Sequence, residues 1–347
     1  MEYRVATKLE QSVESGHATF GRTLLICGVL LLLLAVIFLI AALLGSQRLP
    51  LTASLCALTG KSNCGLSSEE QAILLDLRLP RILLAGAVGM SLAAAGAGYQ
   101  ALLRNPLAEP YLLGVSNGAA VGTMTALVFF GAHEWSRPVM AFAGALLATL
   151  VVYRLARGRA GTSPERLILA GVIVTTFLSS AIVFITTMMD ATRIRSFTFW
   201  LLGDLSGTTS SLLTIGLAAA GIGVGILALN ARSLNLMMLG ERDAFDLGVE
   251  VGRVRLTVFV AASLLVGASV ASSGSVGYVG LVVPHLVRLS FGSDNRVVIV
   301  ASALAGAAFV IVADTVARTI IAPRELPVGA ITALIGAPLF IYLLKRG

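Results

Sequence analysis

Long apolar runs separated by short polar segments are the dominant pattern along this chain. Most of the runs contain about the twenty residues needed to cross a hydrocarbon core of about 30 Å. The expected membrane-spanning helices cover residues 24–44, 82–103, 112–131, 138–153, 167–188, 211–229, 256–272, 279–290, 297–316 and 329–344. The run at 279–290 is short and contains Pro284, which makes it the weakest of the ten. The pattern predicts an all-α, polytopic transmembrane bundle of about ten helices.

The second run is suited to close helix packing. Between Ile82 and Leu103 no residue carries a charge. Small residues leave flat faces that another helix backbone can approach. Four glycines recur in this run: Gly86, Gly89, Gly96 and Gly98.

A faint internal repeat begins in the same run. The segment Gly89-Met-Ser-Leu-Ala-Ala-Ala-Gly96 shares its Gly, Ser and first Ala positions with Gly267-Ala-Ser-Val-Ala-Ser-Ser-Gly274. With ten spans the two copies would run in opposite directions, as the inverted repeats of transporters do. The alternative is chance, because small-residue patterns are common in membrane helices.

Composition supports a membrane domain and argues against a nucleic-acid-binding protein. Apolar residues make up 57% of the 347 residues and charged residues only 12%, against roughly 25% charged in soluble domains. The formal net charge is +7, but the basic residues are scattered singly between apolar runs and form no basic face. We expect one transmembrane domain over residues 24–347, preceded by an N-terminal segment, residues 1–23.

The distribution of Lys and Arg predicts the orientation. An even number of spans places both termini on one side of the membrane. With the N-terminus inside, most of the 25 Lys and Arg residues fall on inner segments, as the positive-inside rule requires. Both termini are therefore expected in the cytoplasm. Cys56 and Cys64 then lie in the first outer loop, where an oxidising compartment favours a local disulfide; two free thiols are the alternative.

The inner segment 232–255 is too charged to enter the membrane and too apolar for a solvated linker. Gly240 is expected to end one short helix by adopting a left-handed conformation. Glu241 and Asp243 then suit the first turn of a second helix. An apolar stripe follows at three- and four-residue spacing: Ala244, Leu247 and Val251. Two short helices with an apolar face predict docking onto a partner, the alternative being a lid on the protein's own spans.

The sequence lacks motifs for binding a nucleotide phosphate or a catalytic zinc ion. It contains no phosphate-binding Gly-x-x-x-x-Gly-Lys-Ser/Thr loop and no HExxH or CxxC motif. Asp314 is the one acid well inside an expected span, and Arg318 lies one helical turn further on. An acid within the membrane is a functional candidate. Here the spacing favours a structural ion pair with Arg318 over a proton relay.

Two arginines at the outer end of the second span are unusual for that side of the membrane. Arg78 and Arg81 flank Pro80, which suits the first turn of a helix. Their three-residue spacing places both guanidinium groups on nearly the same side. An acidic partner approaching from outside would explain them, while snorkelling to the interface is the simpler alternative.

Together these residues resemble the FecCD or BtuC-like permease subunits of iron-siderophore, haem and vitamin B12 ABC importers. The resemblance covers about residues 78–345. It is carried by Arg78-Leu-Pro-Arg81, Asn105-Pro-Leu-Ala-Glu-Pro-Tyr-Leu-Leu-Gly-Val-Ser-Asn-Gly-Ala119, Leu239-Gly-Glu-Arg-Asp-Ala-Phe-Asp-Leu-Gly-Val249, Gly277-Tyr-Val-Gly-Leu-Val-Val-Pro-His-Leu-Val-Arg288 and Glu325-Leu-Pro-Val-Gly-Ala-Ile-Thr-Ala-Leu-Ile-Gly-Ala-Pro-Leu-Phe340. Residues 1–23, the segment 56–64 and the inner loop around Ser163-Pro-Glu165 depart from the family pattern, so no gate residue is assigned.

The resemblance implies a ten-span type II ABC importer permease fold in a bacterial cytoplasmic (inner) membrane. It implies a second permease subunit, identical or paralogous, two cytoplasmic ABC ATPases that carry ATP and Mg²⁺, and an extracytoplasmic substrate-binding protein. No cofactor or metal is expected on this chain. The residues implied to press on the ATPase are Gly240, Glu241, Ala244, Leu247 and Gly248. The residues implied to meet acids of the binding protein are Arg78, Arg81 and Arg318.

The function expected from the resemblance is ATP-driven import of a metal chelate. An iron-siderophore or haem is favoured over vitamin B12. Four residues of the fifth span are expected to line the path: Thr175, Thr176, Ser179 and Ser180. The alternative function is an ion-coupled secondary transporter, which would need buried acids near the midplane, where the sequence places none.

Overall fold

The computed structural model describes residues 20–45, 47, 49–59, 64–130, 135–158 and 161–346 of the chain. These parts form a helical bundle. Their only strands are the short antiparallel pair β1 (Arg157–Gly158) and β2 (Gly161–Thr162). Residues 1–19 of the expected N-terminal segment lie outside the described ranges.

The ten expected spans correspond to ten helices. Seven helices of the described chain are long and apolar enough to cross a membrane. They are α2 (Phe20–Leu43), α5 (Leu79–Leu102), α7 (Ser136–Ala156), α8 (Pro164–Thr186), α10 (Ser210–Leu229), α13 (Val251–Ser273) and α15 (Asn295–Thr319). Three shorter apolar helices are α6 (Val115–Phe129), α14 (Val279–Phe291) and α16 (Val328–Arg346). The ends differ from the expected ones by a few residues, because helices continue into polar flanking turns.

Further short helices connect the spans. They are α3 (Leu51–Leu58), α4 (Ser68–Ala72), the π-helix η1 (Ile73–Arg78), the 3₁₀-helix η2 (Pro110–Leu113), α9 (Ala191–Leu201), α11 (Ala231–Leu239) and α12 (Glu241–Asp246). The pair α11 and α12 matches the two short helices expected in the segment 232–255, although α13 already begins at Val251. The others were not expected, since they are too short or too polar to appear as apolar runs.

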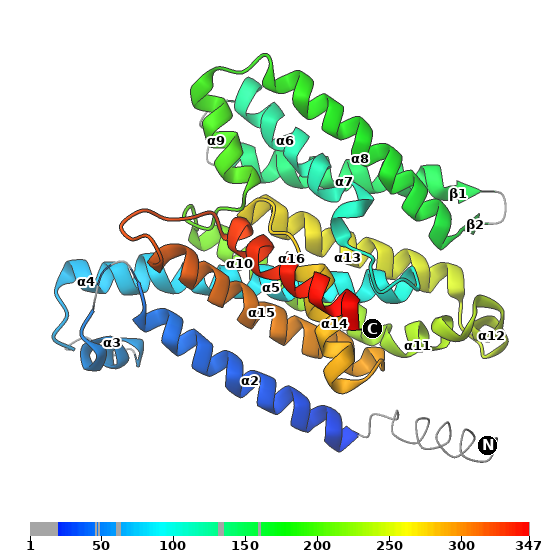
Figure 1. Ribbon diagram of the computed structural model, residues 1–347, viewed down its shortest axis with the longest axis horizontal. Helices are drawn as coiled ribbons and strands as arrows, with labels where there is room; N and C mark the ends of the chain where they lie inside the picture. Colours follow the sequence, from blue (N-terminus) through cyan, green and yellow to red (C-terminus); the bar gives the residue numbers. More distant parts are fainter. Residues whose placement is uncertain are drawn as a thin grey trace.

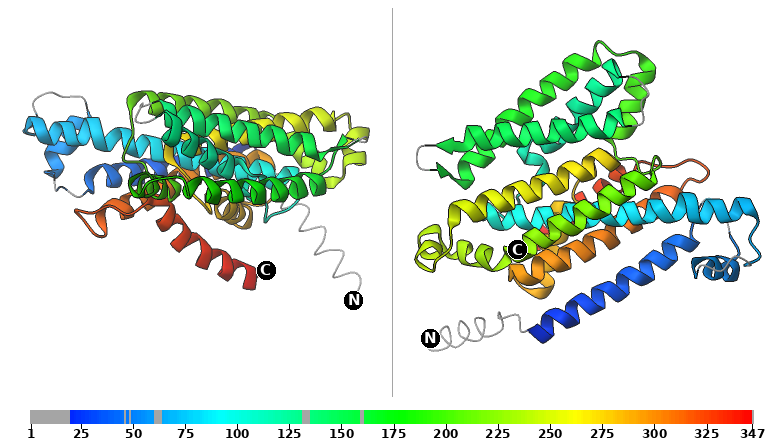
Figure 2. Two further views of the ribbon diagram at one scale, coloured as in Figure 1. Left: turned by 90° about the horizontal axis from the view of Figure 1, so that it is seen from above. Right: turned by 180° about the vertical axis from the view of Figure 1, so that it is seen from behind.

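The bundle has two distinct ends (Figure 1). Helices α3 and α4 lie at one end, which we call the disulfide end because it carries Cys56 and Cys64. Helices α11 and α12 and the β1–β2 pair lie at the opposite end, which we call the coupling end. Helices α6 to α9 form a group along one side of the bundle, and α2 lies along the other side, next to α15 (Figure 2).

Helix α5 is the centre of the bundle, and its glycines allow other helices to approach its backbone. A Cβ on Gly89 would overlap the carbonyl O of Gly306 on α15. A Cβ on Gly96 would overlap the carbonyl O of Gly280 on α14. The glycines of the second expected span therefore serve helix packing, as their pattern predicted.

Helices α6 and α14 are half-length helices. At 1.5 Å per residue the 13 residues of α14 extend about 20 Å, too short for a hydrocarbon core of about 30 Å. The 3₁₀-helix η2 and Glu109 before it meet the segment that precedes α14 inside the bundle. There Tyr111 Oη accepts from the Val276 N–H at 2.9 Å and donates to the Val276 carbonyl O at 2.7 Å. Glu109 Oε1 accepts from the Tyr278 N–H at 3.1 Å. Irregular backbone within a membrane domain requires such internal partners.

Candidate functional site

The coupling end carries the break between α11 and α12. Gly240 joins the two helices with φ of +145°, and Gly248 follows α12 with φ of +85°. Both values lie where a residue with a Cβ is strained. Glu241 and Asp243 occupy the first turn of α12, as expected, where their charges complement the helix dipole.

The side chains around α12 do not form the single apolar stripe that the sequence predicted. Ala244 is fully buried, but Leu247 is 61% exposed. Helix α12 ends at Asp246 and α13 begins at Val251, so Ala244, Leu247 and Val251 do not lie on one helix. Leu239 and Phe245 are each 69% exposed. We call Leu239, Phe245 and Leu247 the coupling face, since these large apolar side chains lie uncovered on α11, on α12 and directly after α12.

Helix α11 is fixed to the start of α15 by polar contacts. Asn235 Nδ2 donates to Asp294 Oδ1 at 2.7 Å, and Asn235 Oδ1 accepts from the Asn295 backbone N–H at 2.8 Å. Asp294 also caps α15 by accepting from the Arg296 N–H. Leu239 of the coupling face therefore lies on a helix, α11, that is anchored to the long span α15.

Glu241 links α12 to two arginines that the sequence analysis did not single out. Arg255, in the first turns of α13, donates through Nη2 to Glu241 Oε1 and through Nη1 to the Thr162 carbonyl O of β2. Arg104 Nη2 lies 3.7 Å from Glu241 Oε1. Nothing in the sequence spacing indicates these pairs, because the partners lie on four separate segments of the chain.

At the disulfide end, Arg78 is the last residue of η1, directly before α5, and is only 4% exposed. Arg78 Nη1 donates to the Ala42 carbonyl O at 2.9 Å, and Nη2 donates to the Gln47 carbonyl O at 3.0 Å. These carbonyl groups lie at and just beyond the C-terminal end of α2. A guanidinium group there satisfies carbonyl groups that the helix itself leaves unpaired.

Arg81 and Arg318 share one buried acid. Asp314 is fully buried; its Oδ2 lies 2.9 Å from Arg318 Nε and its Oδ1 lies 2.9 Å from Arg81 Nη2. Arg81 Nη1 also lies 2.7 Å from Glu325 Oε2. The expected Asp314–Arg318 pair is therefore present. The sequence analysis missed Arg81 as a third member and Glu325 as a fourth.

This network limits how the three arginines can meet a partner. Arg318 is 5% exposed, whereas the Arg81 side chain is 12% exposed and that of Glu325 39% exposed. Arg81 and Glu325 line a small polar cavity of about 190 Å³ together with Asp204 and Ser206. Of the three expected docking arginines, Arg81 thus lies nearest an accessible polar surface, and a docking role for the set stays a prediction.

The expected path residues lie on two faces of α8. Thr175 and Ser179 face α6, where Asn117 Nδ2 donates to the Thr175 carbonyl O at 3.1 Å and to Ser179 Oγ at 2.8 Å. Thr176 and Ser180 are exposed, and each hydroxyl donates to the carbonyl O four residues earlier. The exposed face of α8 thus presents hydroxyl-bearing residues whose hydrogens are already donated to the helix backbone.

Comparison with known proteins identifies the family. The sequence profile of the FecCD transport family matches residues 32–346. The chain belongs to the FecCD transport family. The cobalamin import system permease protein BtuC of Halobacterium salinarum is 41% identical over 300 residues, covering 86% of this chain and 80% of that protein. The hemin transport system permease protein HmuU of Yersinia pestis is 38% identical over 327 residues, covering 93% and 96%.

A solved structure has the same fold as this FecCD-family chain. It is described as an inward-facing conformation of a metal-chelate type ABC transporter, and it is 31% identical to this chain with a TM-score of 0.82. The alignment covers 93% of this chain and 99% of that structure. The chain is therefore a multi-pass transmembrane permease subunit of an ABC transporter.

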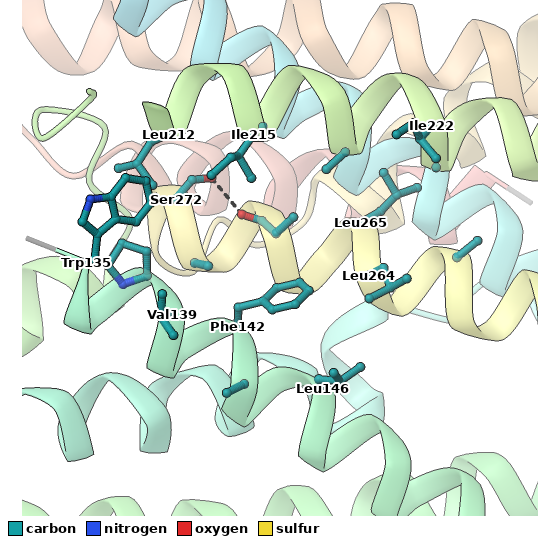
Figure 3. Close-up of a pocket in the computed structure, with 18 of the residues that line it drawn as sticks. Trp135, Val139, Phe142, Leu146, Leu212, Ile215, Ile222, Leu264, Leu265 and Ser272 are labelled. Carbon is teal, nitrogen blue, oxygen red and sulfur yellow. Dashed lines mark hydrogen bonds between the residues drawn. The ribbon is translucent and has the colours of Figure 1, made fainter. Parts of the chain in front are cut away.

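One apolar cavity of this FecCD-family permease offers little to a polar chelate. It has a volume of about 530 Å³ and lies between α7, α10 and α13. Figure 3 shows Phe142 and Leu146 of α7 on one side and Ile215 of α10 on the other. The Ser272 hydroxyl donates to the Ala268 carbonyl O at 2.9 Å. The lining is otherwise apolar apart from the Trp135 indole, so it fits hydrocarbon and offers few groups to orient a polar ligand.

Two remaining expectations concern cysteine and metal chemistry. Cys56 and Cys64 form a disulfide with their Cα atoms 5.5 Å apart. Within the described ranges, no group of three or more His, Cys, Asp or Glu side chains is arranged to hold a metal ion.

Proposed function

We propose that this FecCD-family permease forms one half of the translocation path of an importer for a metal chelate. The observation that carries the proposal is the coupling face. Leu239, Phe245 and Leu247 are large apolar side chains at 61–69% exposure, on short helices beyond the ends of the long spans. Apolar groups exposed together outside the hydrocarbon region mark a surface for a protein partner. An ATPase subunit is the partner that an ABC permease needs.

We infer the orientation of the permease in the membrane from the same ATPase partner. ATP is cytoplasmic, so the coupling end would face the cytoplasm, which places the disulfide end outside. The Cys56–Cys64 disulfide agrees with an oxidising outer compartment. The first described residues of α2 and the last of α16 would then both lie on the cytoplasmic side of a bacterial inner membrane.

At the outer end we propose a docking site for a substrate-binding protein. Arg81, Glu325 and the 190 Å³ cavity beside them offer the accessible charges there. Arg78 and Arg318 would act by holding α2 and α15 in place around Arg81. The path itself would run along the exposed face of α8, where Thr176 and Ser180 lie, with a second permease subunit closing it from the opposite side.

The substrate class is proposed from the relatives. Two of the relatives are named as permeases for cobalamin and for hemin, and the similar solved structure is described as a metal-chelate type transporter. We propose a bulky metal chelate, with an iron-siderophore or haem favoured over vitamin B12. Titration of the cognate binding protein with haem, cobalamin and ferric siderophores tests this choice, and preferential binding of cobalamin would contradict it.

The ATPase partnership is tested by co-purification of the detergent-solubilised permease with its ATPase subunit. The variant Phe245→Asp/Leu247→Asp is expected to lose the ATPase, because charges replace the apolar contacts. The matched control is Leu77→Asp at the disulfide end, where Leu77 is 66% exposed, and it should retain the ATPase. Substrate uptake that persists after ATP depletion would instead support an ion-coupled secondary transporter.

A further inference from the structure

Arg255 is almost completely buried at the coupling end although it lies in the first turns of α13. It is 6% exposed. Its two terminal nitrogens point to different elements: Nη2 donates to Glu241 Oε1 on α12, and Nη1 donates to the Thr162 carbonyl O on β2. Nη1 also lies 3.5 Å from Thr162 Oγ1. One guanidinium group thus contacts both the coupling helix and the β1–β2 pair.

Thr162 connects this contact to α8. Ser163 follows Thr162 directly and is the N-cap of α8, where its Oγ accepts from the Arg166 N–H at 3.4 Å. The β2 strand therefore leads into the helix that carries Thr176 and Ser180 without an intervening linker. A displacement of Thr162 along the bundle would be passed to the N-terminal end of α8.

Glu241 connects the same contact to the coupling face. Glu241 is the first residue of α12, and Phe245 lies one turn further along that helix. A force that the ATPase exerts on Phe245 and Leu247 is therefore transmitted to Glu241 through a single helical turn. Arg104 lies beside Glu241 at 3.7 Å, but its side chain is 40% exposed, against 7% for that of Arg255, so solvent screens that pair more than the partly buried Arg255–Glu241 contact.

The chemistry of arginine suits a link between two elements. A guanidinium group is planar, always charged and presents several donors in a fixed fork, so it can hold two acceptors at a set separation. A lysine ammonium group is a single point on a flexible stem and cannot impose that geometry. The acceptors are one carboxylate and one backbone carbonyl, and the carbonyl position is independent of the side chain at 162.

We infer that Arg255 is a positioning residue that transmits movement of the coupling helix α12 to β2 and hence to α8. The inference rests on the proposed ATPase partnership. In this arrangement the ATPase moves α12, Glu241 carries Arg255 with it, and the Arg255–Thr162 hydrogen bond moves the start of the path helix. Breaking the link leaves the ATPase attached to the coupling face but separates ATP hydrolysis from transport.

The test uses the complete transporter, with permease, ATPase and binding protein, reconstituted in proteoliposomes. ATP hydrolysis and substrate uptake are measured in the same preparation for the wild type and for Arg255→Gln. Coupling between sites typically changes a response by 5- to 150-fold, and we expect the substrate transported per ATP to fall roughly 10-fold. The ATPase should remain bound, with its hydrolysis rate within about two-fold of the wild type.

The matched control is Arg253→Gln. Arg253 lies on the same turn of α13 as Arg255, but its side chain is 81% exposed and its partner Glu250 is 74% exposed. This variant should transport as much substrate per ATP as the wild type. Arg255→Lys should recover only part of the lost coupling, because one ammonium group cannot reach both acceptors in the same geometry.

A purely structural salt bridge gives a different result. It would lower assembly, hydrolysis and uptake together and leave the ratio of transport to hydrolysis unchanged, which would overturn the inference. If Arg255→Gln does not yield an assembled complex, Glu241→Gln replaces it, since it removes the charge from the same link and keeps an acceptor oxygen. An unchanged ratio in Glu241→Gln would also overturn the inference. A wild-type permease that fails to bind the ATPase would contradict the proposed function instead.

Discussion

Arg81 Nη2 lies 2.9 Å from Asp314 Oδ1, although the two residues are separated by 233 positions in the chain. This contact fastens α5 to α15 at the disulfide end. Asp314 also pairs with Arg318 on its own helix, so one fully buried carboxylate balances the buried Arg318 and the partly buried Arg81. The helix pair that forms the centre of the bundle is thus held by glycine packing along its length and by an ionic cluster at one end.

Removing the charge of Asp314 should destabilise the permease strongly. In Asp314→Asn the buried Arg318 loses its counter-charge and Arg81 keeps only Glu325, and breaking a buried ion pair from one side costs about 3–5 kcal/mol. Thermal unfolding in detergent should show the loss. Asp76→Asn makes the same chemical change at an exposed position near the same end and should leave the unfolding temperature unchanged. Equal stability of the two variants would refute the structural role of Asp314.

The close approach of α5 and α14 predicts a second stability difference. Gly96→Ala places a Cβ against the carbonyl O of Gly280, and overpacking of this kind costs about 1–3 kcal/mol. Gly221→Ala on α10 has no atom within 4 Å of the new Cβ, so its stability should be unchanged or slightly raised. Comparison of the two unfolding temperatures is the measurement, and a tolerant Gly96→Ala would contradict the packing argument.

Arg78 should hold the end of α2 in place. Arg78→Met removes donors to the Ala42 and Gln47 carbonyl groups, and hydrogen bonds from a charged group are worth about 1.5–3 kcal/mol. Hydrogen exchange should therefore accelerate in the last turn of α2. Arg137→Met changes an exposed arginine at the start of α7 and should not alter exchange there. Unchanged exchange in Arg78→Met would assign Arg78 to another role, such as docking.

The Cys56–Cys64 disulfide should stabilise the segment around α3 at the disulfide end. Cys56 and Cys64 are eight positions apart, and closing a loop of that length contributes roughly 2–3 kcal/mol on the chain-entropy estimate. The double variant Cys56→Ser/Cys64→Ser should make the segment around α3 more sensitive to limited proteolysis, while α5 stays protected. Cys27→Ser, which changes the free cysteine of α2, serves as the control. Identical cleavage in both variants would contradict the prediction.

The expected site residues were located with unequal success. Gly240 breaks the two short helices and Glu241 lies in the first turn of α12, as the sequence predicted, because a glycine break and an acidic first turn are local signals; the backbone of Gly240, with φ of +145° and ψ of +149°, is not in the expected left-handed conformation. Ala244, Leu247 and Val251 do not share one helix as their spacing suggested, because α12 ends at Asp246 and α13 begins at Val251; a contact of Leu247 with the ATPase stays a prediction. Arg255 was overlooked because a charged residue beside an apolar run reads as an ordinary membrane boundary.

The sequence alone determined the number, the approximate ends and the packing surfaces of the apolar helices. Spanning a hydrocarbon core requires an uninterrupted apolar length, and close packing requires glycine, so both properties are visible within one segment. The tertiary structure decided which charges meet: Arg81 with Asp314, Arg78 with α2, and Arg255 with Glu241 and Thr162. These partners meet only when helices that are distant in the sequence pack against each other. Their spacing along the chain therefore does not predict which charged residues will pair.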